Sequence, residues 1–77
     1  MEEKILDILE EVCEDSDVRD DLDMDLFEED LLDSLAFAEL LVAIEDQLGV
    51  VIAPSEVTRD DMNTANKIIQ MVQSKAN

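Results

Sequence analysis

Apolar residues recur every three or four positions in long stretches of the chain, and this spacing predicts an all-α protein. The first stretch, from about Glu2 to Cys13, places its apolar side chains on one helical face. The second runs from about Ser34 to Leu48 and ends at Gly49, a residue favoured at the C-terminal cap of a helix. The inward positions expected for the first helix are Ile5, Ile8, Leu9, Val12 and Cys13.

The pattern is less regular in the two connections that follow these helices. Residues 14–33 form a long acidic loop, and loops of this length in small domains are uncommon unless they are packed or functional. Val50–Ile52 resembles a strand in composition, but nothing else in the chain could pair with it, so we interpret it as an apolar plug in a loop. The acidic loop should be anchored to the core by Val18, Leu22, Leu26, Phe27, Leu31 and Leu32.

The last third of the chain predicts a short helix and a longer one. Pro54 should open a short helical turn over Ser55–Asp61. Asn63 or Thr64 should then cap a final helix that ends near Lys75. Its inward positions should be Ala65, Ile68, Ile69 and Val72. We therefore predict a small four-helix bundle, with three longer helices, a short third helix and a long loop between the first two, folded as a single domain over residues 1–77.

The predicted second helix carries two apolar stripes. At about 100° per residue, its core face holds Phe37, Leu40, Leu41, Ile44 and Leu48. A second stripe on nearly the opposite face holds Leu35, Ala38 and Val42, with Glu39, Glu45 and Asp46 beside it. Single apolar residues on a surface need no explanation. A stripe that begins directly after Ser34 and is bordered by acids predicts a docking surface for a partner protein.

A formal net charge of −17, from 22 acidic and 5 basic residues without histidine, limits the partners. Nucleic acid and anionic membranes would be repelled, whereas basic protein surfaces would be attracted. Cys13 is the single cysteine, so no internal disulfide can form, and we expect a buried, unreactive thiol. Because the sequence has no signal peptide or membrane-spanning pattern, we expect a cytoplasmic monomer that does not insert into membranes.

Ser34 lies where the acidic loop meets the second helix, and two interpretations of it stay open. Serine is a favoured N-terminal cap, which would make Ser34 purely structural. Asp33 could cap the helix equally well and would leave the Ser34 hydroxyl free. A phosphate ester on that hydroxyl would lie at the positive end of the helix dipole, so the position can carry a phosphate-linked group.

Other chemistry is less well supported by the sequence. Asp21, Asp23 and Asp25 alternate as at the start of a calcium-binding EF-hand loop, but Leu26 replaces the required glycine and Leu32 the closing glutamate. We expect no specific metal site, with a calcium-responsive protein as one alternative. The carboxylates have no apolar enclosure that would suit acid–base catalysis, so we expect no enzyme activity. An acidic helical interaction module without a prosthetic group is another alternative.

The segment Leu31–Leu35, followed by an amphipathic helix, resembles the phosphopantetheine attachment motif of acyl carrier proteins. The order of predicted helices resembles that family over nearly the whole chain. The resemblance implies a 4′-phosphopantetheine arm linked covalently to Ser34, with Asp33 and Leu35 completing the motif. It also implies that the stripe formed by Leu35, Ala38 and Val42, with its neighbouring acids, meets the partner enzymes.

Five segments are similar to the D-alanyl carrier branch of this family: Leu6–Cys13, Asp25–Glu28, Leu31–Leu35, Pro54–Thr64 and Asn66–Ile68. This implies that the arm holds D-alanine as a thioester for the D-alanylation of teichoic acids. The implied partners are a phosphopantetheinyl transferase, an adenylate-forming ligase that loads the arm, and a membrane acyltransferase or synthase that unloads it. A stand-alone acyl or peptidyl carrier of fatty acid, polyketide or nonribosomal peptide synthesis is the alternative, because Met62 stands where that branch usually has tryptophan.

Overall fold

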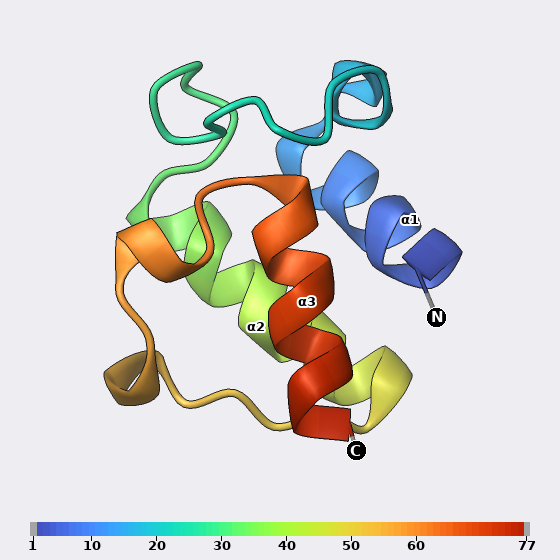
Figure 1. The fold of residues 1–77 in the computed structure, drawn as a ribbon, viewed down its shortest axis with the longest axis vertical. Helices are drawn as coiled ribbons and strands as arrows, with labels where there is room; N and C mark the ends of the chain where they lie inside the picture. The colour runs from blue at the N-terminus through green and yellow to red at the C-terminus, as the bar shows by residue number, and fades with distance from the viewer. Residues whose placement is uncertain (1, 77) are drawn as a thin grey trace.

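The computed structural model describes residues 2–76, apart from the side chain of Arg59, and its described residues contain helices and turns without strands (Figure 1). Three α-helices, α1 (Glu2–Cys13), α2 (Ser34–Leu48) and α3 (Ala65–Ala76), form the body of the molecule. Their bounds confirm the three longer helices expected from the apolar spacing. In the ribbon, α3 lies in front of α2, and α1 lies beside them at one end (Figure 1).

The prediction of one continuous short helix over Ser55–Asp61 is wrong. Two 3-10 helices, η2 (Pro54–Glu56) and η3 (Arg59–Asp61), take its place. Between them Val57 is extended, with φ −130° and ψ 153°. Val57 is buried, so this conformation lets a β-branched side chain join the core. The backbone N–H of Thr58 then donates to the Asp61 carboxylate at 2.9 Å, which starts a new turn.

The core is one apolar cluster formed by the three α-helices and by parts of the connections between them. α1 packs against both α2 and α3, and the connections add side chains around them. Within Val50–Ile52, the first and last side chains are buried and Val51 is 64% exposed, which confirms the apolar plug. The side chains with no exposed surface at all include Ile5, Leu9, Val18, Leu26, Leu40, Ile44, Met62, Ala65, Ile68 and Val72.

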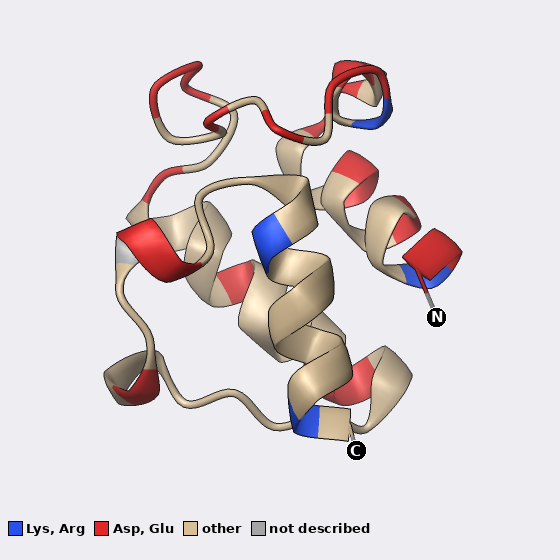
Figure 2. Cartoon of the chain, in the orientation of Figure 1, with Lys and Arg blue, Asp and Glu red and all other residues tan. Residues whose placement is uncertain are grey.

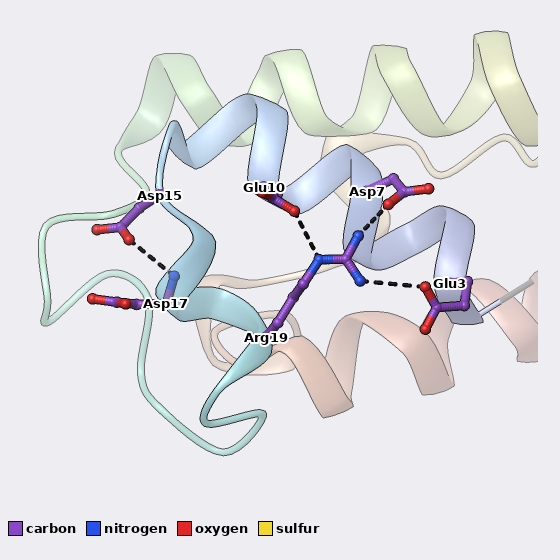
Figure 3. Close-up of polar contacts among 6 residues, drawn as sticks. All are labelled: Glu3, Asp7, Glu10, Asp15, Asp17 and Arg19. Atoms are coloured by element: carbon purple, nitrogen blue, oxygen red, sulfur yellow. Dashed lines mark hydrogen bonds and ion pairs between the residues drawn. The ribbon is translucent and has the colours of Figure 1, made fainter.

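Arg19 links the first half of the acidic loop to α1 through its guanidinium group. A third 3-10 helix, η1 (Ser16–Arg19), which the sequence pattern did not predict, places Arg19 alongside α1. The Arg19 guanidinium bonds Glu10 at 2.7 Å and Glu3 at 3.3 Å, and also bonds Asp7 (Figure 3). The hydrogen bond to Glu10, followed by those to the other acids, raises the pKa of Arg19 above its ordinary value.

The second half of the loop is held to the start of α3. The backbone N–H of Leu26 donates to the carbonyl of Asn63 at 2.7 Å, and that of Asn66 donates to the carbonyl of Leu22 at 3.0 Å. The buried side chains of Leu26, Phe27 and Leu32 then confirm that this loop folds back onto the core. Such packing satisfies the expectation that a long loop in a small protein is fixed rather than free.

Charge is unevenly distributed over the molecule. Figure 2 shows acidic residues along α1, around the long loop and at η3, whereas α3 carries only basic and uncharged residues. The two lysines of α3 both bond to the segment before it. Lys67 donates to the carbonyl of Asp60 at 3.0 Å, and Lys75 bonds the Glu56 carboxylate at 3.0 Å. That bond from Lys75 lowers the pKa of Glu56.

Among residues 2–76, no helix combines the length and the apolar character that crossing a membrane requires.

Candidate functional site

Ser34 is the first residue of α2, and its side chain is exposed. The cap of the helix is Asp33, whose backbone is extended and whose carboxylate accepts the N–H of Ala36 at 2.8 Å. The Asp33 carbonyl also accepts the N–H of Phe37 at 2.8 Å. Of the two candidate N-terminal caps in the sequence, the structure therefore selects Asp33, and the Ser34 hydroxyl is not needed to cap α2.

The chain reaches Asp33 through a tight turn that the loop makes over the core. The carbonyl of Leu26 accepts the backbone N–H groups of both Leu31 and Leu32, at 2.9 and 3.0 Å. Asp30, within this turn, adopts the left-handed conformation with φ 59°. Leu32 is buried while the next two residues are exposed, so the turn fixes one side chain in the core and presents its neighbours to solvent.

An aromatic pair joins this turn to α2. The rings of Phe27 and Phe37 have centroids 5.7 Å apart and planes tilted by 56°, a favourable arrangement for aromatic side chains. Phe27 is buried and Phe37 is half-buried. The pair therefore holds the first turn of α2, which contains Ser34, against the loop that leads into it.

The outward face of α2 presents the second apolar stripe to solvent. Leu35 is 70% exposed and Val42 is 61% exposed, in contrast to the fully buried Leu40 on the opposite face. Ala38 and the acidic residues beside the stripe are also exposed. The side chains that the sequence placed on this face are Leu35, Ala38, Glu39, Val42, Glu45 and Asp46.

A shallow hollow runs along part of this stripe. Its lining residues are Ala38, Glu39, Val42, Ala43, Asp46 and Gln47. Ala43 and Gln47 were not singled out from the sequence, and Glu45 lies outside the hollow. Ala43 and Gln47 follow Glu39 at helical spacings of four, so the same spacing rule could have found them.

A phosphate ester fits the position of Ser34. The first turn of α2 contains no acidic residue, and Ser34 lies at the positive end of the helix dipole. The exposed side chain leaves room for a long flexible arm. Cys13 is half-buried, and burial, with a smaller effect of Asp15, raises the pKa of its thiol to about 11. A neutral thiol of this kind is a poor nucleophile.

The alternating aspartates of the loop are engaged with protein donors. The Asp25 carboxylate accepts the backbone N–H groups of Phe27 and Glu28 at 3.0 and 3.1 Å, and also accepts the side chain of Asn63. The Asp23 carboxylate accepts the Asn66 side chain at 2.7 Å. Over the described residues, no group of three or more acidic or cysteine side chains is arranged to hold a metal ion.

Comparison with known proteins gives one consistent result. Residues 3–72 match a family model described as "Phosphopantetheine attachment site". A D-alanyl carrier protein of Lactococcus lactis subsp. lactis is 49% identical over 75 residues, which cover 97% of this chain and 95% of the relative. One of Abiotrophia defectiva is 47% identical over the same shares. A third, of Bacillus velezensis, is 45% identical over 67 residues, covering 87% and 86% of the two chains.

These matches span nearly the whole fold, including the turn before α2, the exposed serine and the anchored loop. They agree with the helical architecture. The chain therefore belongs to the phosphopantetheine attachment-site family, whose prosthetic group is a covalently attached 4′-phosphopantetheine.

Proposed function

We propose that Ser34 is the attachment residue and that residues 1–77 act as a single carrier domain for an activated D-alanyl group. The observation that carries this proposal is the cap at Asp33, which leaves an exposed Ser34 hydroxyl at the start of α2 without a structural task. The choice of D-alanine as the cargo rests on the relatives that are named D-alanyl carrier protein. The bound group supplies the terminal thiol on which the cargo is held as a thioester.

Attachment of the arm would require a separate enzyme, because the carboxylate next to Ser34, that of Asp33, is engaged in capping the helix. A phosphopantetheinyl transferase would join the Ser34 oxygen to the phosphate of phosphopantetheine and break the diphosphate bond of coenzyme A, which releases adenosine 3′,5′-bisphosphate. The serine proton goes to a base of the transferase. The task of this chain is to present an exposed hydroxyl on a rigid helix end, so we propose a carrier role rather than a catalytic one. Since coenzyme A is the donor, the proposed compartment is the cytoplasm.

The outward face of α2 is the proposed docking surface for partner enzymes. Leu35 and Val42 would enter apolar hollows on the partner, while Glu39, Glu45 and Asp46 would meet its lysine and arginine side chains. Charge attraction of this kind speeds encounter more than it strengthens a complex. A small contact is also released readily, which suits a carrier that must visit several enzymes.

Three kinds of partner follow from this proposal. After the transferase, an adenylate-forming ligase would place D-alanine on the arm, and a membrane acyltransferase would take it off for the D-alanylation of teichoic acids. The relatives' names support the D-alanyl cargo. The acidic surface supports basic docking sites on all three enzymes.

The test is the intact mass of the protein after incubation with coenzyme A and a phosphopantetheinyl transferase. The wild-type chain should gain one phosphopantetheinyl group, and Ser34→Ala should gain none. Ser16→Ala is a matched control, because Ser16 is also exposed and also follows an aspartate that caps a helical turn. It should be modified like the wild type. An unmodified wild-type chain would reject the proposal in favour of an acidic interaction module.

The cargo is tested in a second step with the modified protein. A D-alanine-activating ligase, ATP and D-alanine should add one alanyl group that hydroxylamine removes, as expected of a thioester. Efficient charging by fatty acyl or other aminoacyl ligases, with none by the D-alanine ligase, would reject D-alanine while keeping the carrier role.

A further inference from the structure

Asn63 precedes α3, yet its side chain does not serve that helix. The hydroxyl of Thr64 accepts the backbone N–H of Lys67 at 3.1 Å, so Thr64 supplies the side-chain cap. The Asn63 side chain instead reaches across to the long loop. Its Nδ2 atom donates to the Asp25 carboxylate at 2.9 Å, a contact between residues 38 positions apart in the chain.

Two bonds from Asn63 fix the start of the turn that leads to α2. Besides the side-chain bond to Asp25, its carbonyl accepts the backbone N–H of Leu26 at 2.7 Å. The other oxygen of the Asp25 carboxylate accepts the N–H groups of Phe27 and Glu28. Asn63 therefore bonds Asp25 and Leu26 directly, and Asp25 in turn bonds Phe27 and Glu28.

The oxygen of the Asn63 side-chain amide, unlike its nitrogen, makes no hydrogen bond to the described residues. This Oδ1 atom is buried. A buried acceptor without a partner costs stability, and nearly all such groups in proteins are paired. The side-chain bond that the amide does make, from Nδ2 to Asp25, joins the residue before α3 to the turn.

From this turn, two routes lead to Ser34. Along the backbone, the carbonyl of Leu26 accepts the N–H groups of Leu31 and Leu32, directly before the capping Asp33. Through the side chains, Phe27 packs against Phe37 in the first turns of α2, with ring centroids 5.7 Å apart. The first route begins at Leu26, which bonds Asn63 directly, and the second begins at Phe27, which is linked to Asn63 through the Asp25 carboxylate.

We propose that Asn63 is a positioning residue for Ser34: it fixes the turn at residues 25–28 and thereby the orientation in which the serine is presented to the transferase. The inference rests on the proposed function of Ser34. It assigns to the start of α3 a part in a reaction at the start of α2, although Asn63 itself contacts neither the serine nor the docking face.

Asn66 provides a matched control within the same chain. Its side chain also donates to a loop aspartate, Asp23, at 2.7 Å, and its backbone also bonds the loop. The turn before α2 makes its hydrogen bonds to Asn63 and not to Asn66. Replacing either asparagine by aspartate removes a donor to a loop aspartate and sets two carboxylates against each other. The Asn63 bond is partly buried and the Asn66 bond is exposed, so the comparison is read together with the rescue by the swapped double variant described below.

The experiment measures kcat and KM of phosphopantetheine transfer for the wild type, Asn63→Asp and Asn66→Asp, at a temperature where circular dichroism shows each to be folded. We expect Asn63→Asp to lower kcat roughly tenfold, because small misplacement of a reacting group costs rate. The KM for the carrier should stay near the wild-type value, since the face of α2 is unchanged. Asn66→Asp should keep both constants.

The swapped double variant, Asp25→Asn with Asn63→Asp, should restore kcat. In it the amide at position 25 donates to the carboxylate at position 63, while its carbonyl oxygen still accepts the N–H groups of Phe27 and Glu28. Hydrogen exchange at those two amides should be faster than wild type in Asn63→Asp and restored in the double variant. If Asn63→Asp does not fold, Asn63→Ala removes the same donor without adding charge and should show the same loss of kcat.

Each outcome separates this inference from the proposed function. A wild-type chain that gains no phosphopantetheine rejects the proposed function and this role with it. A wild type that is modified, with Asn63→Asp and Asn63→Ala modified at the same kcat, overturns the role of Asn63 alone. Equal losses of kcat in Asn63→Asp and Asn66→Asp would also overturn it, since the effect would then come from general loosening of the loop.

Discussion

The carboxylate of Asp33 accepts the backbone N–H of Ala36 at 2.8 Å, so α2 is capped by the residue before Ser34. This relationship separates two tasks that a serine at a helix start could otherwise combine. The helix end is stabilised by one side chain, and the neighbouring hydroxyl is left available for chemistry.

The first prediction follows from that division. Asp33→Ala should lower the free energy of unfolding by about 1 kcal/mol, the usual cost of removing a helix cap. Ser34→Ala should change it by less than half of that amount, because its side chain is exposed and the cap bond remains. Urea denaturation of both variants measures the difference. A larger loss for Ser34→Ala than for Asp33→Ala would mean that Ser34 is the structural cap.

The second prediction concerns the exposed stripe of α2. Val42→Asp should leave the fold intact, since this side chain is 61% exposed, and should slow modification by the transferase and loading by the ligase. Val51→Asp is the control, because Val51 is 64% exposed but lies in the loop after α2. It should fold and be modified at the wild-type rate. Equal slowing of both variants would argue against a specific docking surface.

The third prediction concerns Arg19 and the net charge of −17. Arg19→Gln should lower the melting temperature, because the variant loses the attraction between η1 and three acidic residues of α1. Added salt should raise the melting temperature of both proteins by screening repulsion among acids, and more so in the variant. Thermal melts at low and high sodium chloride measure this. A wild-type melting temperature that does not respond to salt would contradict it.

The fourth prediction concerns the Cys13 thiol, whose pKa is raised to about 11 by burial and, to a smaller extent, by Asp15. The folded state holds the thiol proton more tightly than the unfolded state. The protonated thiol therefore contributes fully to the free energy of unfolding at a pH below the ordinary pKa of cysteine. This contribution is lost as pH rises from about 9 to about 11. The melting temperature should therefore fall more steeply over this range in the wild type than in Cys13→Ala. Parallel curves would contradict a buried, protonated thiol.

Local patterns predicted the elements that depend on local spacing. The bounds of α1 and α2, the cap at Gly49 and the inward residues of α3 follow from apolar periodicity and glycine conformation, and the structure has all of them. The two faces of α2 follow from the same periodicity. For this reason the exposed serine and the stripe behind it could be identified from the sequence.

Other features were predicted wrongly or not at all, because each depends on contacts between residues far apart in the sequence. The expected short helix is divided because Val57 is buried in the core, and η1 is fixed by Arg19 against residues 9 to 16 positions earlier. No local pattern could show that Thr64 caps α3 while Asn63 bonds an aspartate 38 positions away.

The sequence by itself determined which segments are helical, which faces are apolar and which serine could carry a group. It could do so because these properties depend on side chains three or four positions apart. Only the tertiary structure decided how the acidic loop is held and which of two neighbouring residues caps α2 and α3. Those choices depend on hydrogen bonds that form after α1, α2 and α3 have packed around the shared core.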